Sequence, residues 1–122
     1  MRSKIDPRVP RYNELITPTF NALRTLGGSG SNEEILNRII IDLSISDEVA
    51  DISHKGNTNM SELQYQLAWT RTYMKKYGVI ENSSRSIWSI KPDYMGVETL
   101  DDRAIITAVV NQGIKQRIEN SS

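Results

Sequence analysis

The stretch SELQYQLAWTRTYMKKYGVIENSSRSIWSI, residues 61–90, decides the fold of this chain. Ser61 is a favourable N-cap, because its hydroxyl can accept a hydrogen bond from an amide of the first helical turn. Gly78 suits the position just after a helix, where φ is often positive. Lys75 and Lys76 would lie in the last turn, where cations complement the helix dipole. These signals predict a helix between Ser61 and Gly78.

Two runs of β-forming residues follow this helix. The first contains Val79 and Ile80, and the second runs over residues 87–90 around Trp88. Residues 82–84, Asn-Ser-Ser, lie between the runs and are predicted to form a loop. A helix followed directly by a two-stranded hairpin, with cations on both, is the layout of a winged helix-turn-helix and favours DNA binding.

The predicted helix has two faces when its residues are placed about 100° apart. The apolar face consists of Leu63, Leu67, Trp69, Tyr73, Met74 and Tyr77. The opposite, polar face consists of Gln64, Ala68, Arg71, Thr72 and Lys75. Arginine can pair with guanine, glutamine with adenine, and lysine can neutralise phosphate, so this face suits a DNA groove. The alternative is an ordinary solvated helix face, which surface helices generally carry.

Composition restricts the possible functions. The 122 residues predict one domain with a single core. The chain has no cysteine, which excludes disulfides and thiolate metal sites, and its one histidine, His54, cannot form a metal site alone. We therefore expect no cofactor. No apolar signal segment follows the first basic residues, and the longest nearly apolar run, 104–110, is too short for a membrane span. We expect a soluble cytoplasmic protein with no membrane partner.

The charge distribution separates one region from the rest. The formal net charge is zero, which argues against a general polyanion binder. Residues 52–91 nevertheless carry six lysines and arginines against two acidic residues, whereas residues 1–51 and 92–122 each have a balance of −2. Positive charge is thus concentrated on the helix and hairpin.

The N-terminal half predicts an arm and two main helices. Residues 1–11 contain two prolines and no apolar periodicity, which indicates a flexible arm. Its cations are Arg2, Lys4, Arg8 and Arg11. The first helix would be capped by Thr17, begin at Pro18 and end near Leu26, with residues 27–30 as a connector.

A second helix would open with a capping box of Ser31 and Glu34. Ser46 would begin a further short turn of helix, and residues 54–59 would form a polar loop before Ser61. Beyond the hairpin, a final helix is predicted from Thr99 to Ile118 with Thr99 as its cap. Its apolar residues cover a wide arc, so it could pack on the first helix, join two copies or bridge to a following domain.

The order of these features resembles the N-terminal winged-helix domain of Mrr-type restriction endonucleases. The resemblance covers roughly residues 10–96. It rests on residues 12–15 before Pro18, on the helix start at Ser31, on LAWTRTYMKKYGVI at 67–80, and on residues 85–88. The departures from the family pattern are Gln66, Ser86 and Lys91. The resemblance implies a DNA-reading module placed ahead of a separate nuclease domain and directed at modified or foreign DNA, with Trp69 in the core.

The predicted fold is α+β and mainly α, a winged helix-turn-helix with a three-helix core, a two-stranded β-hairpin wing and an additional C-terminal helix. Its segments would be a flexible arm (1–11), a winged-helix domain (12–96) and a helix serving as linker or dimerisation element (97–122). The residues expected to contact double-stranded DNA are Lys55, Ser61, Gln64, Tyr65, Ala68, Arg71, Thr72, Lys75, Lys76 and Arg85.

We expect no catalysis from this chain. A nuclease of the kind fused to such modules needs an acidic residue or glutamine two positions before a lysine, to hold Mg²⁺ and activate water. None of the six lysines has one. Two other interpretations remain: a protein-interaction domain in which the final helix and wing join subunits, and a standalone transcriptional regulator.

Overall fold

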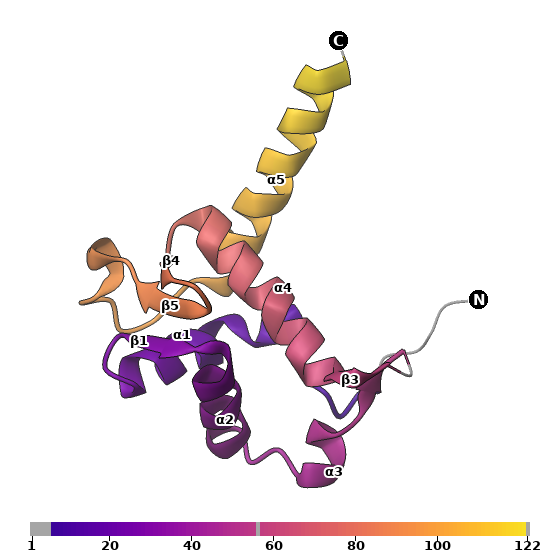
Figure 1. Ribbon diagram of the computed structural model, residues 1–122. Helices are drawn as coiled ribbons and strands as arrows, with labels where there is room; N and C mark the ends of the chain where they lie inside the picture. The colour runs from indigo at the N-terminus through magenta and orange to yellow at the C-terminus, as the bar shows by residue number, and fades with distance from the viewer. Residues whose placement is uncertain (1–5, 56, 122) are drawn as a thin grey trace.

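The computed structural model describes residues 6–55 and 57–121. The elements are η1 (Tyr12–Glu14), α1 (Ile16–Thr25), β1 (Ser29–Ser31), α2 (Asn32–Asp42), α3 (Asp47–Ala50), β2 (Ser53–His54), β3 (Asn57–Ser61), α4 (Glu62–Tyr77), β4 (Ile80–Ser84), β5 (Ile87–Ile90), η2 (Pro92–Tyr94) and α5 (Asp102–Ser121). The fold is α+β and mainly helical, as predicted (Figure 1).

The core lies around α1. Helices α2 and α4 both pack against α1, which contributes the fully buried Phe20 and Leu23. Ile39 from α2 and Leu67 from α4 meet them in one apolar cluster. Burial of these aliphatic and aromatic side chains is the main force that holds the helices together.

Helix α4 begins and ends where the sequence predicts. Ser61 accepts a hydrogen bond from the Gln64 amide and Gln64 caps the Ser61 amide in return, a reciprocal capping box. Gly78 has a φ of 101°, and its N–H bonds to the carbonyls of Met74 and Lys75.

The predicted faces of α4 are partly wrong. The buried side includes the polar residues Gln66 and Thr70, whereas Trp69, expected in the core, is 45% exposed. The Tyr12 N–H donates to Gln66 Oε1 at 2.8 Å, and Thr70 Oγ1 donates to the Tyr12 carbonyl at 2.9 Å. These bonds turn the polar residues inward, because a buried backbone group needs a partner.

The sheet has three strands, not the two predicted. Strand β5 lies between β4 and β1, all antiparallel, with Gly30 opposite Trp88. Residues 29 and 30 are predicted to belong to a connector, and Ser31 is predicted to cap the next helix, a role that the structure confirms. Gly30 is buried, and a Cβ there would lie 2.8 Å from Leu26 Cδ1, so glycine permits the close approach.

Two predicted loops also differ. Strand β4 continues to Ser84, so the hairpin turn falls at Arg85 and Ser86 and not at residues 82–84. Strands β2 and β3 form a short antiparallel pair where a polar loop is predicted over residues 54–59. The short helix after Ser46 is present as α3.

The N-terminal segment is anchored from Asp6 onward. Val9 is buried in the core, and Arg8 forms ion pairs with Asp6 at 2.8 Å and with Glu48 at 3.3 Å. The hydrogen bond from Arg8 lowers the pKa of Asp6 to about 2. Residues 6–11 thus contact the body of the protein, the flexibility expected of the arm stays a prediction, and the predicted arm cations Arg2 and Lys4 lie outside the described residues.

Two predicted helix caps are wrong. Helix α1 already begins at Ile16, and Thr17, the expected cap, donates from Oγ1 to Asp102 Oδ1 at 2.6 Å. Helix α5 begins at Asp102, and Asp101, not Thr99, accepts a hydrogen bond from the Ala104 amide. The Thr17 bond ties the start of α5 to α1.

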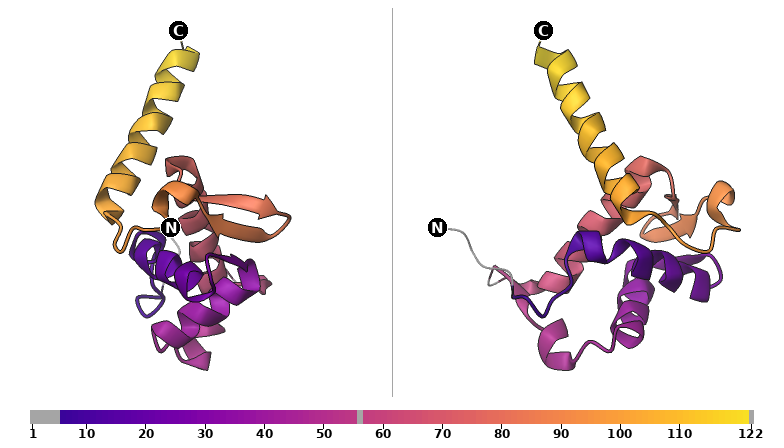
Figure 2. Two further views of the ribbon diagram at one scale, coloured as in Figure 1. Left: turned by 90° about the vertical axis from the view of Figure 1, so that its left-hand side faces the viewer. Right: turned by 180° about the vertical axis from the view of Figure 1, so that it is seen from behind.

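Helix α5 packs mainly on α4 and then leaves the body of the protein. Ile105 and Val109 are buried, whereas Val110, Ile114 and Ile118 are 41%, 42% and 65% exposed. Figures 1 and 2 show its C-terminal half projecting beyond the other elements. Within the described residues, no helix combines the length and apolar character needed to cross a membrane.

Replacement by alanine should change stability in opposite directions at Gly78, just after α4, and at Gly113, within α5. Gly78→Ala should lower the free energy of unfolding by about 1–2 kcal/mol, because φ is 101° and the left-handed region penalises a Cβ. Gly113→Ala, with equally open space but inside α5, should raise helix stability by up to about 1 kcal/mol. Urea denaturation followed by circular dichroism measures both, and equal losses would contradict this assignment.

Candidate nucleic-acid interface

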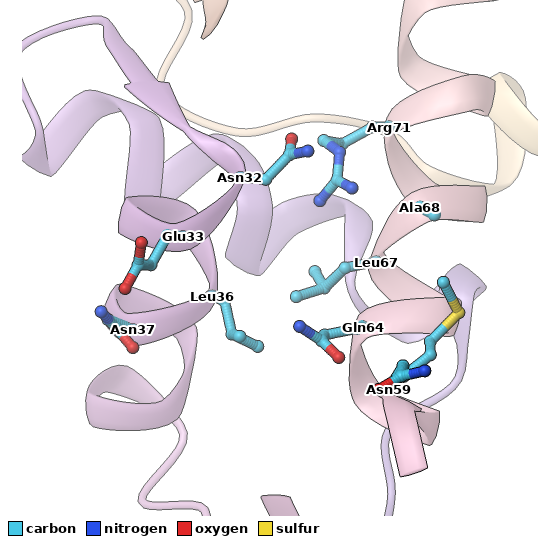
Figure 3. Close-up of a pocket in the computed structure, with 10 residues that line it drawn as sticks. Asn32, Glu33, Leu36, Asn37, Asn59, Gln64, Leu67, Ala68 and Arg71 are labelled. Atoms are coloured by element: carbon cyan, nitrogen blue, oxygen red, sulfur yellow. The ribbon is translucent and has the colours of Figure 1, made fainter. Parts of the chain in front are cut away.

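The polar side of α4 faces a groove. Helices α2 and α4 rest on α1 and leave a cavity of about 440 Å³ between them (Figure 3). Its lining residues are Asn32, Glu33, Leu36, Asn37, Asn59, Met60, Gln64, Leu67, Ala68 and Arg71. Figure 3 shows Leu36 and Gln64 pointing toward each other across the groove, whereas Glu33 and Asn37 lie on the outer side of α2.

Arg71 lies in this groove and not on the outer surface. Its exposed fraction is 9%, which corrects its prediction as an outward-facing residue. The guanidinium carbon lies 5.7 Å from the centre of the Trp88 ring, within range of a cation–π contact. Burial lowers the pKa of Arg71, yet arginine remains protonated in proteins. No acidic side chain of the described residues forms an ion pair with it.

Trp88 connects the groove to the hairpin. Its Nε1–H donates to Asn32 Oδ1 at 2.7 Å, which joins β5 to the first turn of α2. Lys75 Nζ lies 6.0 Å from the same ring and donates to Asn82 Oδ1 of β4 at 3.2 Å. Sequence reasoning placed Trp88 in a strand but missed its role in the site. The available signal was a tryptophan on the predicted strand that follows the helix carrying Arg71 and Lys75, two cations one helical turn apart.

The structure brings together some of the predicted residues. Gln64, Ala68 and Arg71 line the groove, and Ser61 lines its continuation toward α3. Lys75 is exposed beside the hairpin, and Arg85 is exposed in the β4–β5 turn. These residues follow one side of the molecule, from the N-terminus of α4 to the hairpin.

Other predicted residues lie elsewhere or are occupied. Tyr65 stacks on His54 with ring centres 3.7 Å apart, on the flank of α4 that carries Trp69. Lys55 belongs to the β2–β3 turn, near the opposite end of α4 from Lys75. Lys76 lies beside α5, and its neighbours there include Val109. Thr72 Oγ1 donates to the Ala68 carbonyl, a bond inside the helix.

His54 has a structural partner. Its Nδ1 lies 2.8 Å from Glu62 Oε1, and Gln66 Nε2 donates to the other carboxylate oxygen at 2.7 Å. Across the ranges that the structure covers, no three histidine, aspartate or glutamate side chains gather where they could hold a metal ion.

Comparison with known proteins gives one match. The family model described as Mrr N-terminal domain matches residues 12–96, the range over which the sequence shows its resemblance. No curated protein and no solved structure matches the chain significantly.

The two tryptophans should differ in their contribution to stability. Trp88→Phe removes the N–H bonded to Asn32 and should lower the free energy of unfolding by about 1–2 kcal/mol. The control Trp69→Phe changes an exposed ring and should have an effect within about 0.5 kcal/mol. Urea titration of both variants makes the comparison. A larger loss for Trp69→Phe would instead assign it the core role expected from the resemblance.

Proposed function

Because this chain belongs to the family of Mrr N-terminal domains, we propose that it is a winged-helix module that binds double-stranded DNA. Family membership associates the chain with Mrr-type restriction systems, in which the module would serve as the target-recognition part. The observation that carries the proposal is the line of exposed or groove-facing polar groups on α4, continued by Arg85 in the hairpin turn.

The order of elements supports the winged-helix interpretation. Helices α1, α2 and α4 share one core, and α4 leads directly into the β4–β5 hairpin. Strand β1 completes the sheet against β5. One difference from a simple helix-turn-helix is the connection of α2 to α4 through residues 43–61, which is longer than the usual turn of three or four residues.

In this proposal α4 presents its groove-facing side to the bases while exposed cations hold the phosphates. Lys75 lies in the last turn of α4 and Arg85 in the hairpin turn. The two side chains could therefore contact the phosphate backbones on either side of a DNA groove. Phosphate contacts fix the position of the protein on the duplex, and base contacts supply specificity.

We also propose that the chain is not an enzyme and that any nuclease activity belongs to a separate domain. The support is the absence of the acidic-x-lysine pattern from the sequence. Incubation of supercoiled plasmid with the protein and Mg²⁺ should leave the plasmid intact, and cleavage that survives further purification would refute this.

An alternative function is self-association through α5. Val110, Ile114 and Ile118 are exposed at a spacing of four residues on the projecting helix. Contiguous exposed aliphatic residues are a feature of interfaces. A second copy of α5 could bury this row in a two-fold helix pair, either in place of DNA binding or together with it.

DNA binding should depend on the hairpin-side cations. Lys75→Ala combined with Arg85→Ala should weaken binding to duplex DNA and make the dependence of log K on log salt concentration less steep by up to about 1.8, since each phosphate neutralised contributes about 0.9. Fluorescence anisotropy across a salt series measures this. The control Arg103→Ala with Lys115→Ala removes the same charge from α5 and should leave the slope unchanged. An equal loss of DNA affinity in both double variants would show that only nonspecific attraction between positive charge and DNA had been measured.

Self-association should depend on the exposed row of α5. Sedimentation velocity at high protein concentration should show a dimer that Ile114→Glu with Ile118→Glu converts to a monomer, because carboxylates cannot be buried unpaired. The control Lys115→Glu alters net charge equally while sparing the aliphatic row, and should remain dimeric. A monomeric native chain would rule this alternative out.

A further inference from the structure

The groove between α2 and α4 offers a specific hydrogen-bonding pattern, and this inference rests on the proposed DNA-binding function. Arg71 is only 9% exposed, and Figure 3 shows its side chain directed into the space between the two helices. Within the described residues, no protein group pairs with its guanidinium, whose five N–H groups can only donate. Its nitrogens are not enclosed by protein, so these N–H groups open onto the groove and are available to a ligand that accepts hydrogen bonds.

The neighbouring amides also present donors to the groove. The side-chain oxygen of Gln64 accepts a bond from the Ser61 amide at 2.8 Å. The side-chain oxygen of Asn32 accepts the Trp88 indole N–H at 2.7 Å. Each amide therefore turns its NH₂ group to other partners. Arg71, Gln64 and Asn32 together form a site that is rich in donors.

The walls of the site are apolar and suit a flat group. Leu36 from α2 and Leu67 and Ala68 from α4 line the same groove. The guanidinium carbon lies 5.7 Å from the centre of the Trp88 ring, a cation–π contact that favours keeping the guanidinium beside the groove, where its planar fork can form two parallel bonds. A site with these apolar walls fits the flat edge of a nucleobase better than a tetrahedral phosphate.

We infer that this groove binds the N7/O6 edge of a guanine, with Arg71 as the fork that donates to both atoms. Guanine presents two adjacent acceptors on its major-groove edge, whereas adenine and cytosine present an amino donor there. The hydrogen bonds of Gln64 argue against its pairing with adenine. Two-point pairing with adenine needs the side-chain amide oxygen, which already accepts the Ser61 N–H at the start of α4. The guanine could belong to an intact duplex or to an unpaired strand.

Base analogues test this with the native chain. Random-sequence duplexes are prepared with guanine, with 7-deazaguanine, which lacks the N7 acceptor, or with inosine, which keeps both N7 and O6. The 7-deaza duplex should bind at least about fivefold more weakly, and the inosine duplex within about twofold of the guanine duplex. Matching single-stranded probes reveal whether the guanine is read in a duplex or unpaired.

The variant arm assigns the effect to Arg71. Arg71→Met keeps an unbranched chain beside Trp88 and removes the donors, so the variant should bind guanine and 7-deazaguanine duplexes equally. If this variant does not fold, Leu36→Trp, which narrows the groove from α2, should reduce the preference in the same way.

Three outcomes would overturn the inference. Equal binding of guanine and 7-deazaguanine duplexes by the native chain would refute it while leaving DNA binding in place. A salt dependence less steep by about 0.9 in Arg71→Met, together with a native chain that does not discriminate between guanine and 7-deazaguanine, would instead identify Arg71 as a phosphate contact. No duplex binding at low salt would refute the proposed function, and no binding of the single-stranded probes either would refute this inference with it.

Discussion

The contact of Arg71 with the Trp88 ring is the constraint on which the site depends. It holds α4 against β5, while the bond from Trp88 to Asn32 holds β5 against the start of α2. A cation over an aromatic ring contributes about 0.5–2 kcal/mol, depending on desolvation. Strand β1 pairs with β5 and ends at Ser31, which caps α2. The helix that faces the groove, its partner helix and the hairpin are thus fixed relative to one another by neighbouring contacts.

A second polar cluster sets the rotation of α4. Gln66 binds the Tyr12 amide and the Glu62 carboxylate, and Thr70 binds the Tyr12 carbonyl. Because these residues lie on the buried side with Leu63 and Met74, the aromatic residues at 65, 69 and 73 are turned to the opposite flank from the groove. The cluster satisfies a buried backbone unit and a buried carboxylate at once. The direction in which α4 presents its polar residues follows from the chain near Tyr12.

Local sequence signals predicted the bounds of the helices better than the pairing of strands and the burial of side chains. The caps at Ser31 and Ser61 and the glycine at 78 identify the bounds of two helices, because these interactions involve residues close in sequence. The strand at residues 29–31 has the composition of a turn and exists only through its pairing with β5. The burial of Arg71 likewise depends on a ring 17 positions away. Helical periodicity alone cannot distinguish a solvated cation from one held in a groove between two helices.

The attachment of α5 gives the protein a mechanical property. Its first turns are fixed by Ile105, Val109 and the bond from Thr17 to Asp102, whereas the rest projects freely in every view. At 1.5 Å per residue, a helix of this length is about 30 Å long. It therefore acts as a lever: a tilt of about ten degrees at its root moves its tip by about 5 Å. Small rearrangements near α1 and α4 would be amplified into a displacement at the C-terminus.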